Sequence, residues 1–277
     1  MVSGLSIAFM GVTALIAFGV PVVLFLGLRK RFGLKIVPLL VGAAVFIVFA
    51  LVLEQIMHAL VLRPGADGSI ALRTAQPVLY VLYAAFAAGI FEETGRLTGF
   101  LILKKKYAGV RTAISYGIGH GGIEAWLLAG LSAVSSIALG LMVNAGVALP
   151  ASADSTVEAL KTTAPALFLV GGIERLSAIA LHLALSVFVW VAVTRRARWW
   201  LFPLAIVLHA AADVSAATYQ VGGIPLWAVE VVTAAFAVVL LVVAIRMVRG
   251  CLAEERTAAE DATAEQLSEE PAEAEAP

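Results

Sequence analysis

Seven apolar stretches, each long enough to cross a lipid bilayer, constrain this chain more than any other feature of its sequence. A membrane-spanning helix needs about 20 mainly apolar residues. The stretches cover approximately residues 5–28, 34–61, 77–103, 109–143, 165–193, 199–217 and 225–246. Charged residues make up only 14% of the chain, against roughly 25% in soluble domains. The sequence therefore predicts an all-α, polytopic transmembrane helix bundle of about seven spans.

The fourth stretch differs from the others because it is long and rich in glycine. Gly117, Gly119, Gly121 and Gly122 surround His120. Glycines in a membrane helix permit close approach to a neighbouring helix, or a local break where backbone lines a cavity. We therefore expect this stretch either to break or to extend beyond the bilayer.

Basic residues between the spans predict the orientation, because Lys and Arg stay on the cytoplasmic side of a membrane. One set of connections carries 14 of them: Arg29, Lys30, Arg31, Lys35, Lys104, Lys105, Lys106, Arg111, Arg195, Arg196, Arg198, Arg246, Arg249 and Arg256. The other set carries three: Arg63, Arg73 and Lys161. This asymmetry predicts an N-terminus outside and a C-terminus in the cytoplasm. The alanine-rich composition and short loops suit a multi-pass protein of a bacterial plasma membrane.

The chain is predicted to divide into a transmembrane domain, 1–250, and an acidic tail, 251–277. Residues 253–277 hold nine of the 19 acidic residues and one of the 19 basic residues. Such a segment has too few large apolar side chains to fold alone, so we expect a disordered cytoplasmic tail. The remaining basic residues form short clusters, which argues against nucleic acid as a partner. The single cysteine, Cys251, excludes an internal disulfide and any cysteine-based zinc site.

Ionisable side chains within the predicted spans are numerous and grouped. Such a group at the bilayer centre costs about 2.5–3.5 kcal/mol on insertion scales, so each one needs a partner or a function. They lie in four spans: Glu92, Glu93 and Arg96 in the third, His120 and Glu124 in the fourth, Glu174, Arg175 and His182 in the fifth, and His209 and Asp213 in the sixth. A single polar cavity within the bundle is the economical explanation for all of them.

Four of these side chains are predicted to lie at one depth. Counted from the nearest basic residue on the predicted cytoplasmic side, Glu93, His120, His182 and His209 are 11, 9, 13 and 11 residues away. At about 1.5 Å per helical residue, each lies roughly 14–20 Å inside the cytoplasmic edge. Four antiparallel spans therefore present a carboxylate and three imidazoles at the same level.

Helical spacing predicts pairs among these groups. His120 and His209 are each followed four residues later by an acid, Glu124 and Asp213. That spacing lets the acid hydrogen-bond the imidazole and fix its orientation. Arg96 lies four residues after Glu92 and three after Glu93, so it can pair with either carboxylate. Four residues are interpreted as holding the others in place: Glu124, Asp213, Glu174 and Arg175.

Paired carboxylates with imidazoles suit the activation of water. One Glu can act as general base, while His residues polarise a carbonyl or hold a metal ion. Zinc takes two or three His or carboxylate ligands and keeps one position open. No HExxH motif is present in the chain, so a Zn²⁺ site would have to be assembled across helices. Activation by a glutamate alone remains the alternative.

Three motifs resemble the signatures of the CAAX-protease and bacteriocin-processing superfamily. They are Glu92-Glu93-Thr-Gly-Arg96, Tyr116-Gly-Ile-Gly-His120 and His209-Ala-Ala-Ala-Asp213. The fuller set includes Gly-His-Gly-Gly-Ile-Glu124 and Glu174-Arg175 with His182. It is similar to the YhfC branch, whose members are regarded as intramembrane metalloproteases. In the better-known CAAX proteases the arginine follows the glutamate pair after three residues, and here it follows after two.

The resemblance implies an intramembrane metallopeptidase that hydrolyses a peptide bond of a membrane-associated peptide or protein, in a cavity expected to open to the cytoplasm. It makes Glu92 or Glu93 the base that activates water, with Arg96 orienting both. It makes His120 and His209 metal-binding or oxyanion-stabilising groups. The candidate metal ligands are His120, His182, His209 and Glu93, with His182 interpreted as completing the site in this branch.

Two other classes of protein remain as alternatives. A non-catalytic scaffold or peptide-binding membrane protein is one, as in the seven-span scaffold subunit of gamma-secretase, which lacks the glutamate pair. A proton- or metal-coupled transporter is the other, since it would also carry carboxylates and histidines near the midplane. The glutamate pair argues against a scaffold, and no internal inverted repeat favours a transporter.

Overall fold

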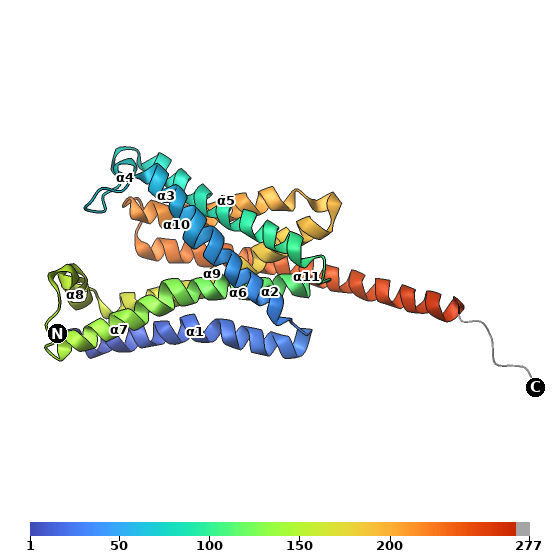
Figure 1. The fold of residues 1–277 in the computed structure, drawn as a ribbon, viewed down its shortest axis with the longest axis horizontal. Helices are drawn as coiled ribbons and strands as arrows, with labels where there is room; N and C mark the ends of the chain where they lie inside the picture. The colour runs from blue at the N-terminus through green and yellow to red at the C-terminus, as the bar shows by residue number, and fades with distance from the viewer. Residues whose placement is uncertain (270–277) are drawn as a thin grey trace, which may run out of the picture.

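The chain forms a bundle of long helices in the computed structural model, which describes residues 1–269 (Figure 1). Over that range the secondary structure is helical, with no strand. Seven helical segments are long and apolar enough to cross a membrane: Gly4–Phe32, Ile36–Leu62, Pro77–Leu103, Arg111–Asn144, Pro165–Thr194, Arg196–Gln220 and Leu226–Gln266. The predicted seven-span, all-α architecture is therefore confirmed.

The individual helices follow the predicted spans closely. In chain order they are α1 (Gly4–Phe32), α2 (Ile36–Phe46), α3 (Gln55–Leu62), α4 (Ala71–Ala75), α5 (Pro77–Leu103), α6 (Arg111–Glu124), α7 (Leu131–Asn144), α8 (Asp154–Thr162), α9 (Pro165–Thr194), α10 (Leu201–Gln220) and α11 (Leu226–Glu269). Short 3₁₀ turns at Ala151–Ala153 and Arg196–Arg198 precede α8 and α10.

Two of the spans contain a π-helical segment. Ile47–Glu54 joins α2 to α3, and Ala125–Gly130 joins α6 to α7. The glycine-rich fourth span therefore does not break but continues as a long helix, which is one of the two outcomes expected for it. Its π-helical segment begins directly after Glu124, and such segments occur frequently at functional sites.

The bundle has two ends of different character. The end that carries the N-terminus, α4 and α8 is called the N-terminal face (Figure 1). The opposite end carries the connections 29–35, 104–111 and 195–198 and is called the basic face. Helix α11 leaves the bundle at the basic face and projects beyond it (Figure 1). The predicted placement of the basic face in the cytoplasm stays a prediction.

Helix α9 lies at the centre of the bundle. It packs against α1, α5, α6, α10 and α11, and every residue from 184 to 191 is buried. All of them except Ser186 belong to an apolar core shared with the halves of α5, α6 and α10 nearest the basic face, including Phe100, Ala113 and Leu201. The core therefore fills the bundle between the polar residues at mid-depth and the basic face.

Close contact between α2 and α6 depends on glycine. A Cβ atom at Gly119 would overlap the backbone carbonyl of Leu39, and one at Gly42 would overlap the carbonyl oxygen of Tyr116. The two helices thus touch backbone to backbone, as in the small-residue interfaces of membrane helices. This contact holds in place the helix that carries His120.

The acidic tail differs from the expectation of disorder over much of its length. Helix α11 continues to Glu269, because alanine and glutamate are strong helix formers. The tail also contacts the bundle: Glu255 accepts a hydrogen bond from the backbone N–H of Val110 at 2.9 Å, and Glu254 pairs with Arg195 at 2.5 Å. Residues 270–277 lie outside the described range, and the predicted domain boundary stays a prediction.

Substitution of Gly119 tests the backbone contact between α2 and α6. We expect Gly119→Ala to lower stability by about 1–3 kcal/mol, because the added methyl group has to displace backbone atoms of α2. The measurement is the unfolding temperature of detergent-purified protein. Gly27→Ala is the matched control, since a Cβ there meets nothing within 4 Å. An equal effect of both substitutions would contradict the contact.

Candidate metal centre

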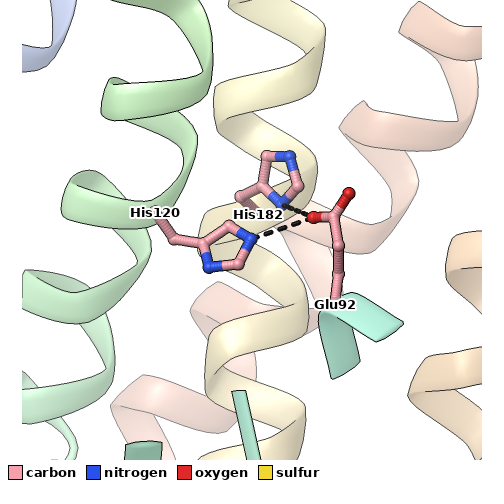
Figure 2. A group of neighbouring side chains, drawn as sticks. All are labelled: Glu92, His120 and His182. Carbon is pink, nitrogen blue, oxygen red and sulfur yellow. Dashed lines mark hydrogen bonds and ion pairs between the residues drawn. The ribbon is translucent and has the colours of Figure 1, made fainter. Parts of the chain in front are cut away.

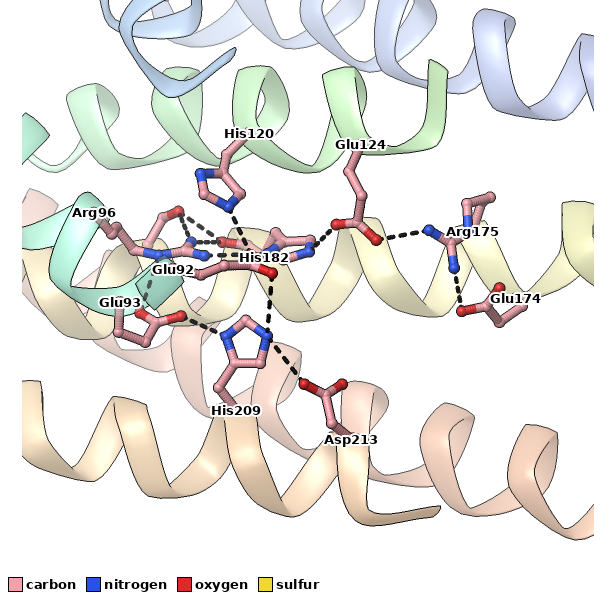
Figure 3. A network of polar contacts seen from close by, with 11 residues as sticks. Glu92, Glu93, Arg96, His120, Glu124, Glu174, Arg175, His182, His209 and Asp213 are labelled. Carbon is pink, nitrogen blue, oxygen red and sulfur yellow. Dashed lines mark hydrogen bonds and ion pairs between the residues drawn. The ribbon is translucent and has the colours of Figure 1, made fainter. Parts of the chain in front are cut away.

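Four helices direct ionisable side chains to one point at mid-depth in the bundle. Glu92 of α5 lies at the centre of this cluster, with His120 of α6, His182 of α9 and His209 of α10 around it (Figures 2 and 3). Its Oε2 atom is 2.9 Å from Nε2 of His120 and 3.8 Å from Nδ1 of His182. Its Oε1 atom is 3.9 Å from Nε2 of His209. The structure thus brings together the imidazoles that the sequence places at one depth.

The neighbouring glutamate has a different environment. Glu93 pairs with Nε of Arg96 at 3.0 Å, and both side chains are 0% exposed. Its other oxygen lies 2.7 Å from Nδ1 of His209. Arg96 also donates to the backbone carbonyl of His182 at 2.7 Å and to the hydroxyl of Ser186 at 2.5 Å. Arg96 therefore selects Glu93 among its two possible partners, and Glu93 is held on both of its oxygens.

The hydrogen-bond partners of His182 and His209 indicate where each ring carries its proton. Arg96 is only a donor, and its Nη2 atom lies 3.1 Å from Nδ1 of His182, so this nitrogen accepts. The Nε2–H of His182 then donates to Oε2 of Glu124. His209 donates its Nδ1–H to the Glu93 carboxylate. His209 therefore turns its unprotonated Nε2 atom toward Glu92, whereas the lone pair on Nδ1 of His182, also near Glu92, is engaged by Arg96.

A chain of contacts continues from His182 toward the N-terminal face. Glu124, in contact with Nε2 of His182, also accepts a hydrogen bond from Arg175 at 2.6 Å. Arg175 in turn pairs with Glu174 (Figure 3). Asp213 extends the cluster in the same direction from α10, with Oδ2 at 3.5 Å from Nε2 of His209. The four residues interpreted as holding the others in place thus lie in contact with the cluster or with one another.

His120 is positioned mainly by packing. Its ring stacks on Tyr116, with centroids 5.8 Å apart, and meets the edge of Phe46 at 5.3 Å. Its Nε2 atom contacts Glu92, whereas its buried Nδ1 atom has no hydrogen-bond partner. Glu124, four residues later, is therefore not its partner but that of His182. A metal-bound imidazole usually donates its second N–H to a neighbour, an arrangement open to His182 and His209 but not to His120.

The arrangement fits a divalent metal ion. One ligand atom from each of Glu92, His120 and His182 lies within 4.8 Å of the other two, and all three residues are buried. The lone pair on Nε2 of His209 and the Glu92 carboxylate, 3.9 Å apart, repel one another unless a cation or a proton lies between them. Two histidines with one glutamate form a known ligand set of catalytic zinc sites. The predicted ligand set shares His120 and His182 with this group, which has Glu92 in place of Glu93 and does not include His209. Glu93 faces Arg96 and His209 instead.

Three further side chains contribute to the site although the sequence did not predict them as site residues. Ser186, one helical turn after His182, accepts the hydrogen bond from Arg96, and its i,i+4 spacing from His182 was the available signal. Phe46 and Tyr116 fix the His120 ring. Tyr116 lies within the motif that resembles a family signature, but nothing in the local sequence of Phe46 distinguishes it from other apolar residues of its span.

Seven membrane-spanning helices around a buried glutamate and three imidazoles define a polytopic membrane protein with a candidate intramembrane metal centre. A family model described as YhfC intramembrane metalloprotease matches residues 14–233, so the chain belongs to this family. The match includes every residue of the cluster.

A curated relative supports the same assignment. The chain is 34% identical over 246 residues to the uncharacterized membrane protein YhfC of Bacillus subtilis strain 168. The aligned region covers 86% of this chain and 94% of that protein. No solved structure matches the chain. The chain is thus a multi-pass membrane protein of the YhfC family.

Removal of Arg96 tests whether its ion pair with Glu93 supports the cluster. We expect Arg96→Met to destabilise the protein by about 3–5 kcal/mol, since it leaves a buried carboxylate without its cation. The double variant Arg96→Met/Glu93→Gln should recover part of that loss, because it removes the unpaired charge. Thermal unfolding of the wild type, both single variants and the double variant completes the cycle. Simple additivity of the two single effects would show that the pair is not coupled.

Proposed function

We propose that the protein is an intramembrane metallopeptidase that hydrolyses a peptide bond of a membrane-associated peptide or protein. The observation that carries this proposal is Glu92, a buried carboxylate that faces nitrogen atoms of three imidazoles. The family description supports it. The likeness of the three motifs to those of the CAAX-protease and bacteriocin-processing superfamily is consistent with the same reaction.

The residues that would hold Zn²⁺ are Glu92 through Oε2, His120 through Nε2, and His182 through Nδ1, which would have to give up its hydrogen bond from Arg96. Oε1 of Glu92 would then remain without a metal contact. A bound zinc ion would polarise the peptide carbonyl and lower the pKa of water. Glu124 orients His182 through Nε2, and Arg175 holds Glu124 in place. The Glu124 and Arg175 contacts thus fix an imidazole that faces Glu92, as neighbouring carboxylates do for metal-bound histidines in other sites.

The two adjacent glutamates are assigned different roles. Glu93 is a positioning residue, because Arg96 and His209 already engage its two oxygens. Glu92 faces the imidazoles, and its Oε1 atom is directed away from His120 toward His209 (Figure 3). We assign Oε1 of Glu92 as the acceptor of the proton from water. The resulting hydroxide attacks the carbonyl carbon. Nε2 of His209, at 3.9 Å from Oε1, accepts the proton from Oε1 and passes it to the amine nitrogen as the C–N bond breaks.

A purely structural role for the cluster accounts for less of this geometry. A scaffold needs the Arg96–Glu93 pair at most, since one buried ion pair joins the helices. It has no use for a second carboxylate that faces imidazole nitrogens rather than a cationic side chain. The arrangement around Glu92 therefore favours hydrolysis of a bound peptide over passive binding.

Zinc content tests the metal centre. Protein purified in detergent without chelators is expected to hold about one equivalent of zinc, measured by mass spectrometry, and His120→Ala and His182→Ala should lose it. His58→Ala is the matched control, because His58 contacts Glu54 and Tyr83 outside the cluster. A wild-type protein without zinc after this preparation would reject the metal and leave activation by Glu92 alone.

Activity is tested by comparing protein termini in membranes from cells that make the wild type or Glu92→Gln at equal levels. Loss of a general base typically costs 10²–10⁴-fold in rate, so termini generated by the wild type should fall at least about a hundredfold in the variant. Glu230→Gln on α11, outside the contact network, should retain them. Identical termini with Glu92→Gln and the wild type would argue against Glu92 as the base.

A further inference from the structure

We propose that water and the substrate peptide reach Glu92 from the N-terminal face, through a polar cavity between α1, α7 and α9 that ends at Arg175. The peptide part of this proposal rests on the proposed function, whereas the water route does not. It differs from the expectation of a site open to the cytoplasm, if the basic face lies there as predicted. The two sides of the cluster, toward the basic face and toward the N-terminal face, are built differently.

The side of the cluster toward the basic face is closed. Arg96 covers Glu93 on this side and is itself bonded to His182 and Ser186 of α9. Beyond Arg96 lies the apolar core, in which Phe100, Ala113 and Leu185 are 0% exposed. Interiors of this kind are packed with few voids larger than a water molecule. A pocket of about 240 Å³ at the basic face reaches Ser115, but the fully buried ring of Tyr116, which stacks on His120, closes the cluster on this side.

The side toward the N-terminal face contains a cavity of about 300 Å³. It lies between the N-terminal halves of α1 and α9, the π-helical segment after α6, and α7. Its polar lining residues are Thr13, Ser132, Ser136, Glu174 and Arg175. Polar groups in a membrane span are tolerated where they line a water-filled cavity or meet other protein groups. Hydroxyls and an ion pair on three helices therefore indicate that this cavity holds water.

Arg175 connects the cavity to the cluster. It lines the cavity and donates a hydrogen bond to Glu124, which contacts His182. The residue is 8% exposed, and its Nε atom is buried without a hydrogen-bond partner. An unpaired buried donor costs free energy, and because other atoms of Arg175 line the cavity, a shift of its guanidinium group would bring Nε to a water molecule or a peptide carbonyl there. Only the Glu124 carboxylate separates this donor from the imidazole of His182.

The exposure of the acidic side chains also favours entry from the N-terminal face. The acidic side chains of the network become more exposed away from Glu92, from 10% for Glu92 itself to 33% for Glu174 and 36% for Asp213. Arg96 and Glu93, on the opposite side, are 0% exposed. A carboxylate at membrane depth needs water or a cation. The network is therefore hydrated from the N-terminal face, and the peptide that enters there is an unwound segment whose carbonyl groups meet Arg175.

Cysteine reactivity tests this route, because a charged thiol reagent that cannot cross membranes reacts only with cysteines that water reaches. The background is full-length Cys251→Ser in sealed vesicles. Ser132→Cys and Ser136→Cys, one helical turn apart on α7, report on the cavity. Ala113→Cys, in the apolar core, is the buried control. Ser69→Cys and Lys105→Cys, both in exposed connections, mark the N-terminal and basic faces, so the result does not depend on the predicted orientation.

We expect the two cavity cysteines to react from the side that labels Ser69→Cys, at least tenfold faster than Ala113→Cys. Reaction only from the side that labels Lys105→Cys would overturn the proposal, as would rates equal to that of Ala113→Cys. The reactivity does not depend on zinc or on cleavage. Labelled cavity cysteines in a protein without zinc or activity would keep the water route and reject the metallopeptidase.

Discussion

The buried ion pair between Arg96 and Glu93 organises the centre of this bundle. Two charges in a membrane interior are tolerated only when they meet each other and further hydrogen-bond partners. Arg96 binds α9 through His182 and Ser186, and Glu93 binds α10 through His209. One helical turn of α5 thereby fixes the relative rotation of three helices. The orientation of two imidazoles, and with it the environment of Glu92, depends on this pair.

Adjacent residues of α5 differ because a helix turns by about 100° per residue. Glu93 points toward Arg96, where its charge is balanced on both oxygens. Glu92 points into the space between α6, α9 and α10, where it faces nitrogen atoms that carry lone pairs (Figure 3). The same type of side chain thus supplies a structural anchor at position 93 and, in the proposed function, the base at position 92. In this buried, low-dielectric network, Glu92 is therefore a carboxylate whose charge no arginine balances.

Much of the architecture and part of the site could be predicted from the sequence. Apolar runs gave the spans, and residue counts from basic connections placed one carboxylate and three imidazoles at one depth. The partners could not be predicted, because spacing leaves helix rotation undetermined. Glu124 faces His182 rather than His120 since Gly117 and Gly121 let α6 approach α9 at that histidine. Composition also did not predict that part of the tail is helical, because local helix propensity rather than burial determines the structure there.

The long final helix has a mechanical consequence. Glu254 and Glu255 tie α11 to Arg195 and to the backbone of Val110, the residue directly before α6. Beyond these ties α11 projects away from the bundle (Figure 1). The projecting arm is therefore anchored at the start of α6, the helix that carries His120. His120 lies ten residues after Val110. A force on the projecting arm would therefore act first at Arg195 and at the residue that precedes α6.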